Sequence, residues 1–214
     1  MNFKNKTKKL NKKVRERLKV SPRCHDWEHT LRVIHNTEVI MVGEKDVDRQ
    51  VVFLGALLHD IARADEIAIQ GKQCHATRGA ELAKKILKKE EFNKKFRKKV
   101  VMCVKRHRYR SSDEPITVEE KIVYDADKLD SVGAVGVGRA FLFAGNVGAK
   151  VHNTAEDALN SQAYSENDTA YREFLVKQQH IPGKMLTVTG RKIALERVKF
   201  METFFDKLNG EIYS

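Results

Sequence analysis

Histidine and aspartate residues recur in this sequence in short motifs that are typical of metal binding. Imidazole and carboxylate groups are ligands for borderline and hard divalent cations. If the helices that carry the motifs meet, two His and two Asp could surround one Mn, Fe, Mg or Zn ion. The motifs are, in chain order, HDWEHTLRV at 25–33, LLHDIAR at 57–63, the isolated His75 and His107, and DADKLD at 125–130.

The pair His59-Asp60 stands at the end of a nearly continuous apolar stretch, VVFLGALLHDIA. An unpaired polar pair in such a place would lose free energy unless another group satisfies it. Taken alone, a His-Asp pair at a helix end is more often a cap, and a lone buried Asp more often holds a backbone amide. The order and spacing of all the motifs therefore carry the argument, and not any single residue.

In this order and spacing the sequence resembles the HD superfamily of metal-dependent phosphohydrolases. Members of that superfamily are helical bundles with a histidine on one helix, a His-Asp pair on the next and a distant Asp on a later one. The resemblance extends, over about residues 20–205, to small bacterial HD hydrolases with H-x-x-x-H-x-x-R-V, A-L-L-H-D-I, two downstream histidines, D-A-D-K/R-L-D and G-A-x-G. Relatives of this kind are nucleotide phosphohydrolases or pyrophosphohydrolases.

The resemblance assigns metal binding to particular residues, in agreement with the ligand chemistry. His75 and His107 match positions that in some members hold a second metal and in others contact phosphate. Their alternative role is that of core histidines that only make hydrogen bonds. The predicted ligands of the metal are His29, His59, Asp60 and Asp127.

Basic and acidic residues beside these ligands are candidates for the other tasks of a phosphohydrolase. A cation can contact phosphate oxygens or form a surface salt bridge. Asp65 and Glu28 are candidates for a general base or for a group that holds a ligand in place. We predict catalytic roles for Asp60, Asp65 and Lys128, and substrate contacts for Arg32, Arg63, His75, His107 and Lys128.

The predicted reaction is hydrolysis of a (deoxy)nucleoside triphosphate to the monophosphate and pyrophosphate. Hydrolysis of a nucleoside monophosphate or a guanosine alarmone belongs to the same chemistry and stays an alternative. Ala62 stands where many relatives have glycine, which leaves the site intact. The H-D-x-G-Y-P signature of cyclic-dinucleotide phosphodiesterases is absent from the sequence. The expected cofactor is a divalent cation, Mn first, with Mg, Fe, Co, Ni or Zn as alternatives.

Two other classes of protein compete with this prediction. His25, Glu28 and His29 formally fit the H-x-x-E-H motif of a zinc peptidase, but that hypothesis leaves HDIA and DADKLD without a role. The net charge of +12 and the basic N-terminus are compatible with a nucleic-acid-binding module. No aromatic residues interleave with the basic tracts as stacking platforms, so nucleic acid is a secondary partner.

The elements that must position these residues are helices, because apolar residues recur at three- and four-residue steps and no long segment alternates with period two. The predicted fold class is all-α, a single-domain helical bundle of the HD type. Residues 1–20 form a basic N-terminal helix and residues 21–214 one compact body. Helices are expected at 10–20, 25–42, 51–62 after an N-cap at Asp46, 76–89, 92–109, 117–130 and 188–209, with a surface excursion at 150–183.

The bulk composition limits the class of protein further. Apolar residues make up 41% and charged residues 33% of the 214 residues, which suits a globular helical protein. No apolar run could span a membrane, and the N-terminus lacks the features of a secretory signal. Cys24, Cys74 and Cys103 are expected as reduced thiols, which together with these absences predicts a cytoplasmic protein. The oligomeric state stays open between monomer and homodimer.

Overall fold

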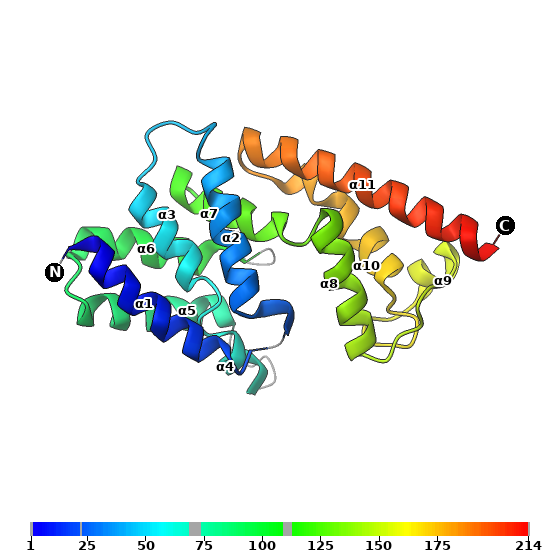
Figure 1. The fold of residues 1–214 in the computed structure, drawn as a ribbon, viewed down its shortest axis with the longest axis horizontal. Coiled ribbons are helices and arrows are strands. Elements are labelled where there is room, and N and C mark those ends of the chain that lie inside the picture. The colour runs from blue at the N-terminus through cyan, green and yellow to red at the C-terminus, as the bar shows by residue number, and fades with distance from the viewer. Residues whose placement is uncertain (1, 22, 69–73, 109–112, 214) are drawn as a thin grey trace. The chain divides into compact units, whose positions relative to one another are not determined.

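The computed structural model describes residues 2–21, 23–68, 74–108 and 113–213 (Figure 1). Every regular element within these ranges is an α-helix or a short 3-10 helix, which confirms the predicted all-α class. None of the described helices is both long and apolar enough to cross a membrane. Residue 109, the last of the predicted helix 92–109, lies outside the described ranges.

The chain divides into two compact units, Met1–Asp127 and Lys128–Ser214. The prediction of one compact body over residues 21–214 stays a prediction. The first unit contains α1 Phe3–Leu18, η1 Arg23–His25, α2 Trp27–Ile40, α3 Arg49–Leu58, α4 Arg63–Ala68, α5 His75–Lys89, α6 Lys94–Arg106 and most of α7 Val118–Leu129. The second contains α8 Gly133–Asn146, α9 Ala155–Asn160, α10 Ala170–Val176, η2 Gln178–His180, η3 Pro182–Lys184 and α11 Val188–Tyr213.

The basic N-terminal helix α1 is part of the first unit. It begins at Phe3, within the predicted span 1–20 and before the apolar pattern at 10–20, because the Asn2 side chain accepts a hydrogen bond from the Asn5 amide at 3.0 Å. Its apolar face, Leu10, Val14 and Leu18, is buried where α1 packs on α2 and α3. The predicted division of the chain at residue 20 stays a prediction.

Helix α3 is the centre of the first unit, as its apolar sequence predicted. Its residues from Val51 to Leu58 are buried apart from Phe53, and it packs between α2 and α6. The N-cap is Asp48, whose side chain accepts from the Val51 amide, and not Asp46 as predicted. Asp46 instead adopts a positive φ of 55° in the loop before the helix.

Gly55 permits the close approach of α3 to its neighbours. A Cβ atom at this position would lie 2.7 Å from Cys103 Cβ on α6 and 3.1 Å from Val123 Cγ2 on α7. Neither of these atoms is the free end of a flexible side chain, so the helices themselves would have to move apart.

Substitution Gly55→Ala is therefore expected to lower the free energy of unfolding by about 1–3 kcal/mol through overpacking. Chemical denaturation followed by circular dichroism measures this. The matched control is Gly138→Ala in α8, where a Cβ meets nothing within 4 Å, and a gain of up to about 1 kcal/mol is expected from helix propensity. A Gly55→Ala protein as stable as the native chain would contradict the packing argument.

The second unit has an aromatic core under α11. Phe205 of α11 contacts Phe141 of α8 and Phe174 of α10, with ring centroids 6.5 and 4.9 Å apart. Phe200 of α11 is 48% exposed, whereas the neighbouring Met201 is buried. The expected surface excursion at 150–183 is likewise packed into α9 and α10, which bury side chains such as Phe174.

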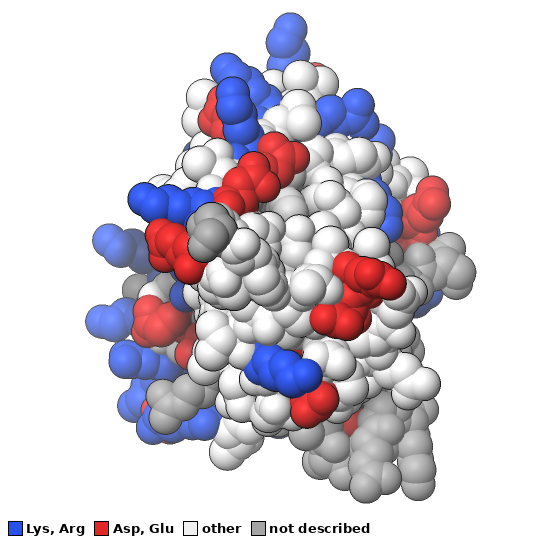
Figure 2. Space-filling view, turned by 90° about the vertical axis from the view of Figure 1, so that its right-hand side faces the viewer, with Lys and Arg blue, Asp and Glu red and all other residues white. Residues whose placement is uncertain are grey.

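Charge is distributed unevenly between the two units. Residues 1–127 hold 30 of the 41 Lys and Arg residues but only 19 of the 29 Asp and Glu residues. Figure 2 faces the side where α9 and the C-terminus lie in Figure 1, and shows mostly uncharged surface broken by a few charged side chains. The first unit thus carries a net charge of +11 (30 − 19) out of the total of +12, which could attract an anionic ligand.

Candidate metal centre

Three helices of the first unit bring the four predicted ligands together. His29 lies in the first turn of α2, where the N-cap Asp26 accepts a hydrogen bond from its amide at 3.0 Å. His59 is the C-cap of α3, and Asp60 follows it in the turn that leads to α4. Asp127 lies in the last turn of α7. Three of the four predicted ligands, His29, His59 and Asp127, therefore lie at the ends of helices.

The ligand atoms are close enough to share one ion. His29 Nε2 lies 3.1 Å from His59 Nε2, and each of these atoms lies 3.7 Å from Asp60 Oδ2. Asp127 Oδ1 lies 3.5 Å from His29 Nε2 and 3.9 Å from His59 Nε2. Donors bound at about 2.1 Å to a common ion lie about 3.0–3.5 Å apart in octahedral or tetrahedral geometry. A divalent cation fits among these four side chains after small adjustments.

Hydrogen bonds on the far side of the imidazoles favour metal binding over ion pairing. His59 Nδ1 lies 2.7 Å from the Ala56 carbonyl oxygen, and His107 Nδ1 lies 2.6 Å from that of Val104. A carbonyl only accepts, so Nδ1 carries the proton and Nε2 keeps its lone pair. The Nε2 lone pair of His59, which faces His29 Nε2 at 3.1 Å, is therefore available to a cation.

A second group of potential ligands lies on the other oxygen of Asp60. Asp60 Oδ1 lies 3.3 Å from His75 Nε2 and 3.6 Å from His107 Nε2, and these two nitrogens are 3.2 Å apart. All three side chains are buried. His107 points inward as predicted, and the carboxylate of Asp60 could bridge two cations.

Burial favours the neutral form of His59 and His75. It lowers the pKa of His59 and of His75 to about 4, against the opposing attraction of Asp60. For Asp60, burial favours the neutral form, but the facing imidazoles of His59 and His25 outweigh it and hold the pKa of the carboxyl well below its usual range. Neutral imidazole and ionised carboxylate are the forms that bind metals.

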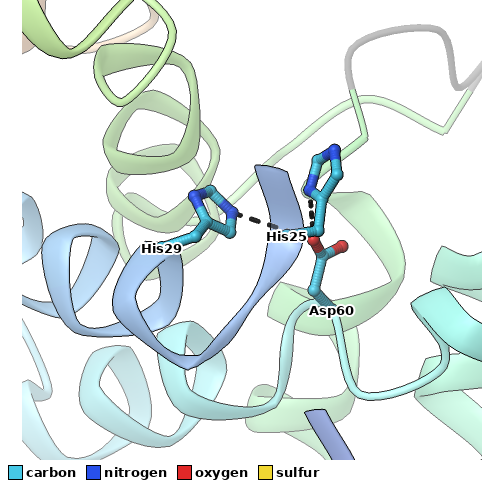
Figure 3. Close-up of side chains that lie close together, drawn as sticks. All are labelled: His25, His29 and Asp60. Carbon is cyan, nitrogen blue, oxygen red and sulfur yellow. Dashed lines mark hydrogen bonds and ion pairs between the residues drawn. The ribbon is translucent and has the colours of Figure 1, made fainter. Parts of the chain in front are cut away.

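The structure adds two residues that the sequence prediction did not include. His25 Nδ1 lies 2.8 Å from Asp60 Oδ2, and Figure 3 shows His25 and His29 both directed at the Asp60 carboxylate. Glu66 Oε2 lies 2.7 Å from His75 Nδ1. The first residue of HDWEH was a signal for His25, whereas nothing in the sequence near Glu66 distinguished it from Asp65.

The predicted general bases do not face the ligands. Asp65 is engaged by Arg17, whose Nη2 donates to both carboxylate oxygens at 2.7 and 2.9 Å, and it also pairs with Arg78. Glu28 is exposed. Because the glutamate of an H-x-x-E-H peptidase must face its metal, the exposure of Glu28 also removes the basis for that alternative.

The predicted phosphate contacts lie in different surroundings. The guanidinium of Arg63 contacts His25, His75 and Glu66 and is part of the cluster. Arg32 is half-buried on α2, one turn after His29. Lys128 follows Asp127 in α7 and is buried, with 8% of its surface exposed.

A helical body that joins a histidine, a His-Asp pair and a distant aspartate in this order is that of an HD-type metal-dependent phosphohydrolase. A family model described as HD domain matches residues 26–132. The chain belongs to the HD domain family.

Comparison with known proteins supports this membership along most of the chain. YpgQ of Bacillus subtilis is 33% identical over 196 residues, which cover 88% of this chain and 84% of YpgQ. Its crystal structure has a TM-score of 0.76 at 26% identity, covering 100% of this chain and 99% of that one. YpgQ has also been crystallised in complex with ADP, at a TM-score of 0.73, 26% identity and coverage of 100% and 98%. A predicted HD superfamily hydrolase from an uncultured Thermotogales bacterium has a TM-score of 0.67 at 29% identity, covering 95% and 91%.

Proposed function

We propose that this protein hydrolyses a phosphoanhydride bond of a nucleotide, with (deoxy)nucleoside triphosphates converted to the monophosphate and pyrophosphate. The observation that carries the proposal is the cluster of His29, His59 and Asp127, with Asp60 Oδ2 3.7 Å from both imidazoles. The ADP complex of YpgQ supports a nucleotide as the ligand. The positive charge of the first unit would favour the approach of such an anion.

In this proposal, the four ligands hold a divalent cation, Mn first, with Mg, Fe, Co, Ni or Zn as alternatives. A bound cation would supply Lewis-acid activation of water and neutralise charge on phosphate oxygens. Asp60 orients the ligand cluster, because its two oxygens face imidazoles on both sides. Arg32 and Lys128 are the proposed phosphate contacts. Asp65, paired with two arginines, has no part in the mechanism.

The arrangement of His75 and His107 around Asp60 is compatible with two roles, binding of a second cation or contact with phosphate. With Asp60 Oδ1 they could hold a second cation, and without it their Nε2 atoms could face a phosphate oxygen. The facing Nε2 atoms at 3.2 Å favour the cation, because two lone pairs in contact are stabilised by a positive charge between them.

A screen of nucleotides against several divalent ions, with products separated by ion-exchange chromatography, tests the proposal. Equal amounts of nucleoside monophosphate and pyrophosphate from a triphosphate, with Mn²⁺ supplied, are the expected result. Inorganic phosphate from a monophosphate, or pyrophosphate from a guanosine alarmone, would favour one of the alternative substrates. A protein that binds none of Mn, Mg, Co, Ni or Zn and turns over no phosphorylated compound would contradict the proposal.

The substitution Asp127→Ala is expected to remove most of the bound Mn²⁺, because the carboxylate lies within 3.9 Å of both His29 Nε2 and His59 Nε2. Metal content after gel filtration measures this. A peptidase that used only the first motif would keep its metal in this variant, so retention would contradict the HD assignment of the ligands.

The positive charge of the first unit is also compatible with nucleic acid as a secondary partner, in addition to the enzyme activity. Retention on heparin that persists in a His59→Ala variant would favour such a role, whereas loss of all nucleotide turnover in the same variant supports the enzyme. Cys24, Cys74 and Cys103 are not in disulfides, which is compatible with the proposed cytoplasmic location. Monomer and homodimer remain equally compatible with this function.

A further inference from the structure

The guanidinium of Arg63 contacts two side chains beside the candidate metal centre. One is His25, which bonds to Asp60 Oδ2, and the other is Glu66, which bonds to His75. Arg63 is the first residue of α4 and follows the turn that bears Asp60, whose carbonyl accepts its amide at 2.9 Å. Its Nη2 lies 2.7 Å from His25 Nε2, and its Nη1 lies 2.9 Å from Glu66 Oε2. The side chain is 21% exposed, so it is largely enclosed by these partners.

The contact with His25 determines which nitrogen of that imidazole carries the proton. An arginine side chain only donates, so His25 Nε2 must accept, and the proton of the neutral ring lies on Nδ1. His25 Nδ1 then donates to Asp60 Oδ2 at 2.8 Å, the bond drawn in Figure 3. Asp60 Oδ2 is the oxygen that faces His29 and His59. Arg63 therefore orients one metal-facing oxygen through His25.

The contact with Glu66 bears on the tautomer of His75, the imidazole that faces the other carboxylate oxygen of Asp60. Glu66 Oε2 accepts from Arg63 Nη1 and lies 2.7 Å from His75 Nδ1, so His75 Nδ1 donates to it. Arg63 Nη1 also lies 2.9 Å from His75 Nδ1, but a protonated Nδ1 leaves the carboxylate as its acceptor. The lone pair of His75 then lies on Nε2, which faces Asp60 Oδ1 and His107.

We propose that Arg63 is a positioning residue of the metal centre: it sets the tautomers of His25 and His75 together, and so presents Asp60 and His75 to divalent cations. The inference rests on the proposed metal centre. It replaces the predicted contact between Arg63 and substrate phosphate, because the guanidinium nitrogens that would bind phosphate are directed at His25 and Glu66.

Measurements of metal affinity and of substrate affinity distinguish a positioning role of Arg63 from a direct contact with substrate phosphate. In Arg63→Ala, Mn²⁺ binding measured by titration calorimetry without nucleotide is expected to weaken by about 10–100-fold, as for other groups that hold metal ligands. The KM for nucleotide at saturating Mn²⁺ should stay within about threefold of the native value. A raised KM with unchanged Mn²⁺ affinity would overturn the inference and restore the phosphate contact.

Two isosteric variants of His25 test the route through Asp60. In His25→Asn the side-chain NH₂ can stand near the position of Nδ1 and donate to Asp60, whereas in His25→Gln it stands near Nε2. Asn is expected to keep Mn²⁺ affinity within about threefold, and Gln to lose about 10–100-fold. Equal losses in the two variants would overturn the tautomer argument.

The control is Arg78→Ala on α5, which removes an arginine that pairs with Asp65 and Glu81 and with none of the ligands. It is expected to bind Mn²⁺ as the native protein does, and thermal denaturation verifies that each variant is folded. A native protein that binds no Mn²⁺ would overturn the metal centre and the inference with it. Native binding that Arg63→Ala leaves unchanged would overturn the inference alone.

Discussion

The substitution Asp60→Asn is expected to abolish nucleotide hydrolysis, with kcat/KM lowered by about a thousandfold or more. Asp60 is 3% exposed, and its two oxygens face separate groups of imidazoles, three at Oδ2 and two at Oδ1. The variant keeps the shape of the side chain but removes the negative charge that faces the imidazoles on both sides. Loss of metal assistance costs several kcal/mol of transition-state stabilisation, and each 1.4 kcal/mol is about tenfold in rate. Steady-state kinetics and Mn²⁺ titration measure the two losses.

The matched control for this variant is Asp65→Asn, five residues further along the same segment. Its carboxylate pairs with Arg17 and Arg78 and with none of the imidazoles, so activity should stay within a few-fold of the native value. An Asp65→Asn protein as inactive as Asp60→Asn would restore the general base predicted from sequence. An active Asp60→Asn protein with normal Mn²⁺ affinity would contradict the metal centre.

The metal-free protein is expected to lose stability steeply as the pH falls from about 6.5 to 4. Burial lowers the pKa of His25 to about 3 and those of His59 and His75 to about 4, whereas an unfolded chain has the usual value near 6.5. Between these values the unfolded chain binds more protons than the folded one, so the free energy of unfolding decreases on acidification. Each imidazole contributes up to about 1.4 kcal/mol per pH unit. Urea denaturation at a series of pH values in a chelating buffer measures the slope.

A variant with one imidazole fewer checks the origin of this slope. In His75→Gln the number of protons taken up on unfolding at pH 5 is expected to fall by about one, while the plateau above pH 7 is retained. A slope equal to that of the native chain would mean that other groups cause the acid lability.

The main helices and their order were predictable because their periodicity is strong. The predicted segments 25–42 and 188–209 correspond to α2 and α11 within a few residues at each end. The inward face of α11 is less evident from the sequence, because it combines the small Ala194 with Met201 and Phe205 while the aromatic Phe200 is exposed. Polar sequence also concealed the short helices at 155–176.

The cluster of His29, His59, Asp60 and Asp127 was predictable because the residue types and their order are specific, whereas the groups that hydrogen-bond to the cluster were not. Glu66 and Asp65 are adjacent acids, and only the direction of α4 decides that one reaches His75 and the other Arg17. The contact between Arg63 and His25 joins residues 38 positions apart and depends on the turn after Asp60. Such contacts are properties of the folded backbone and have no local pattern.

The N-terminal helix α1 is bonded to the turn after Asp60, which gives it a structural role in addition to its positive charge. Arg17 Nε donates to the Ile61 carbonyl at 2.7 Å, while its Nη2 holds Asp65 at the start of α4. A chain trimmed of its first twenty residues would lose this brace, and the loop carrying the acidic ligand would be free to shift. Tests of polyanion binding are therefore better served by neutralising exposed lysines of α1 one at a time than by deleting the helix.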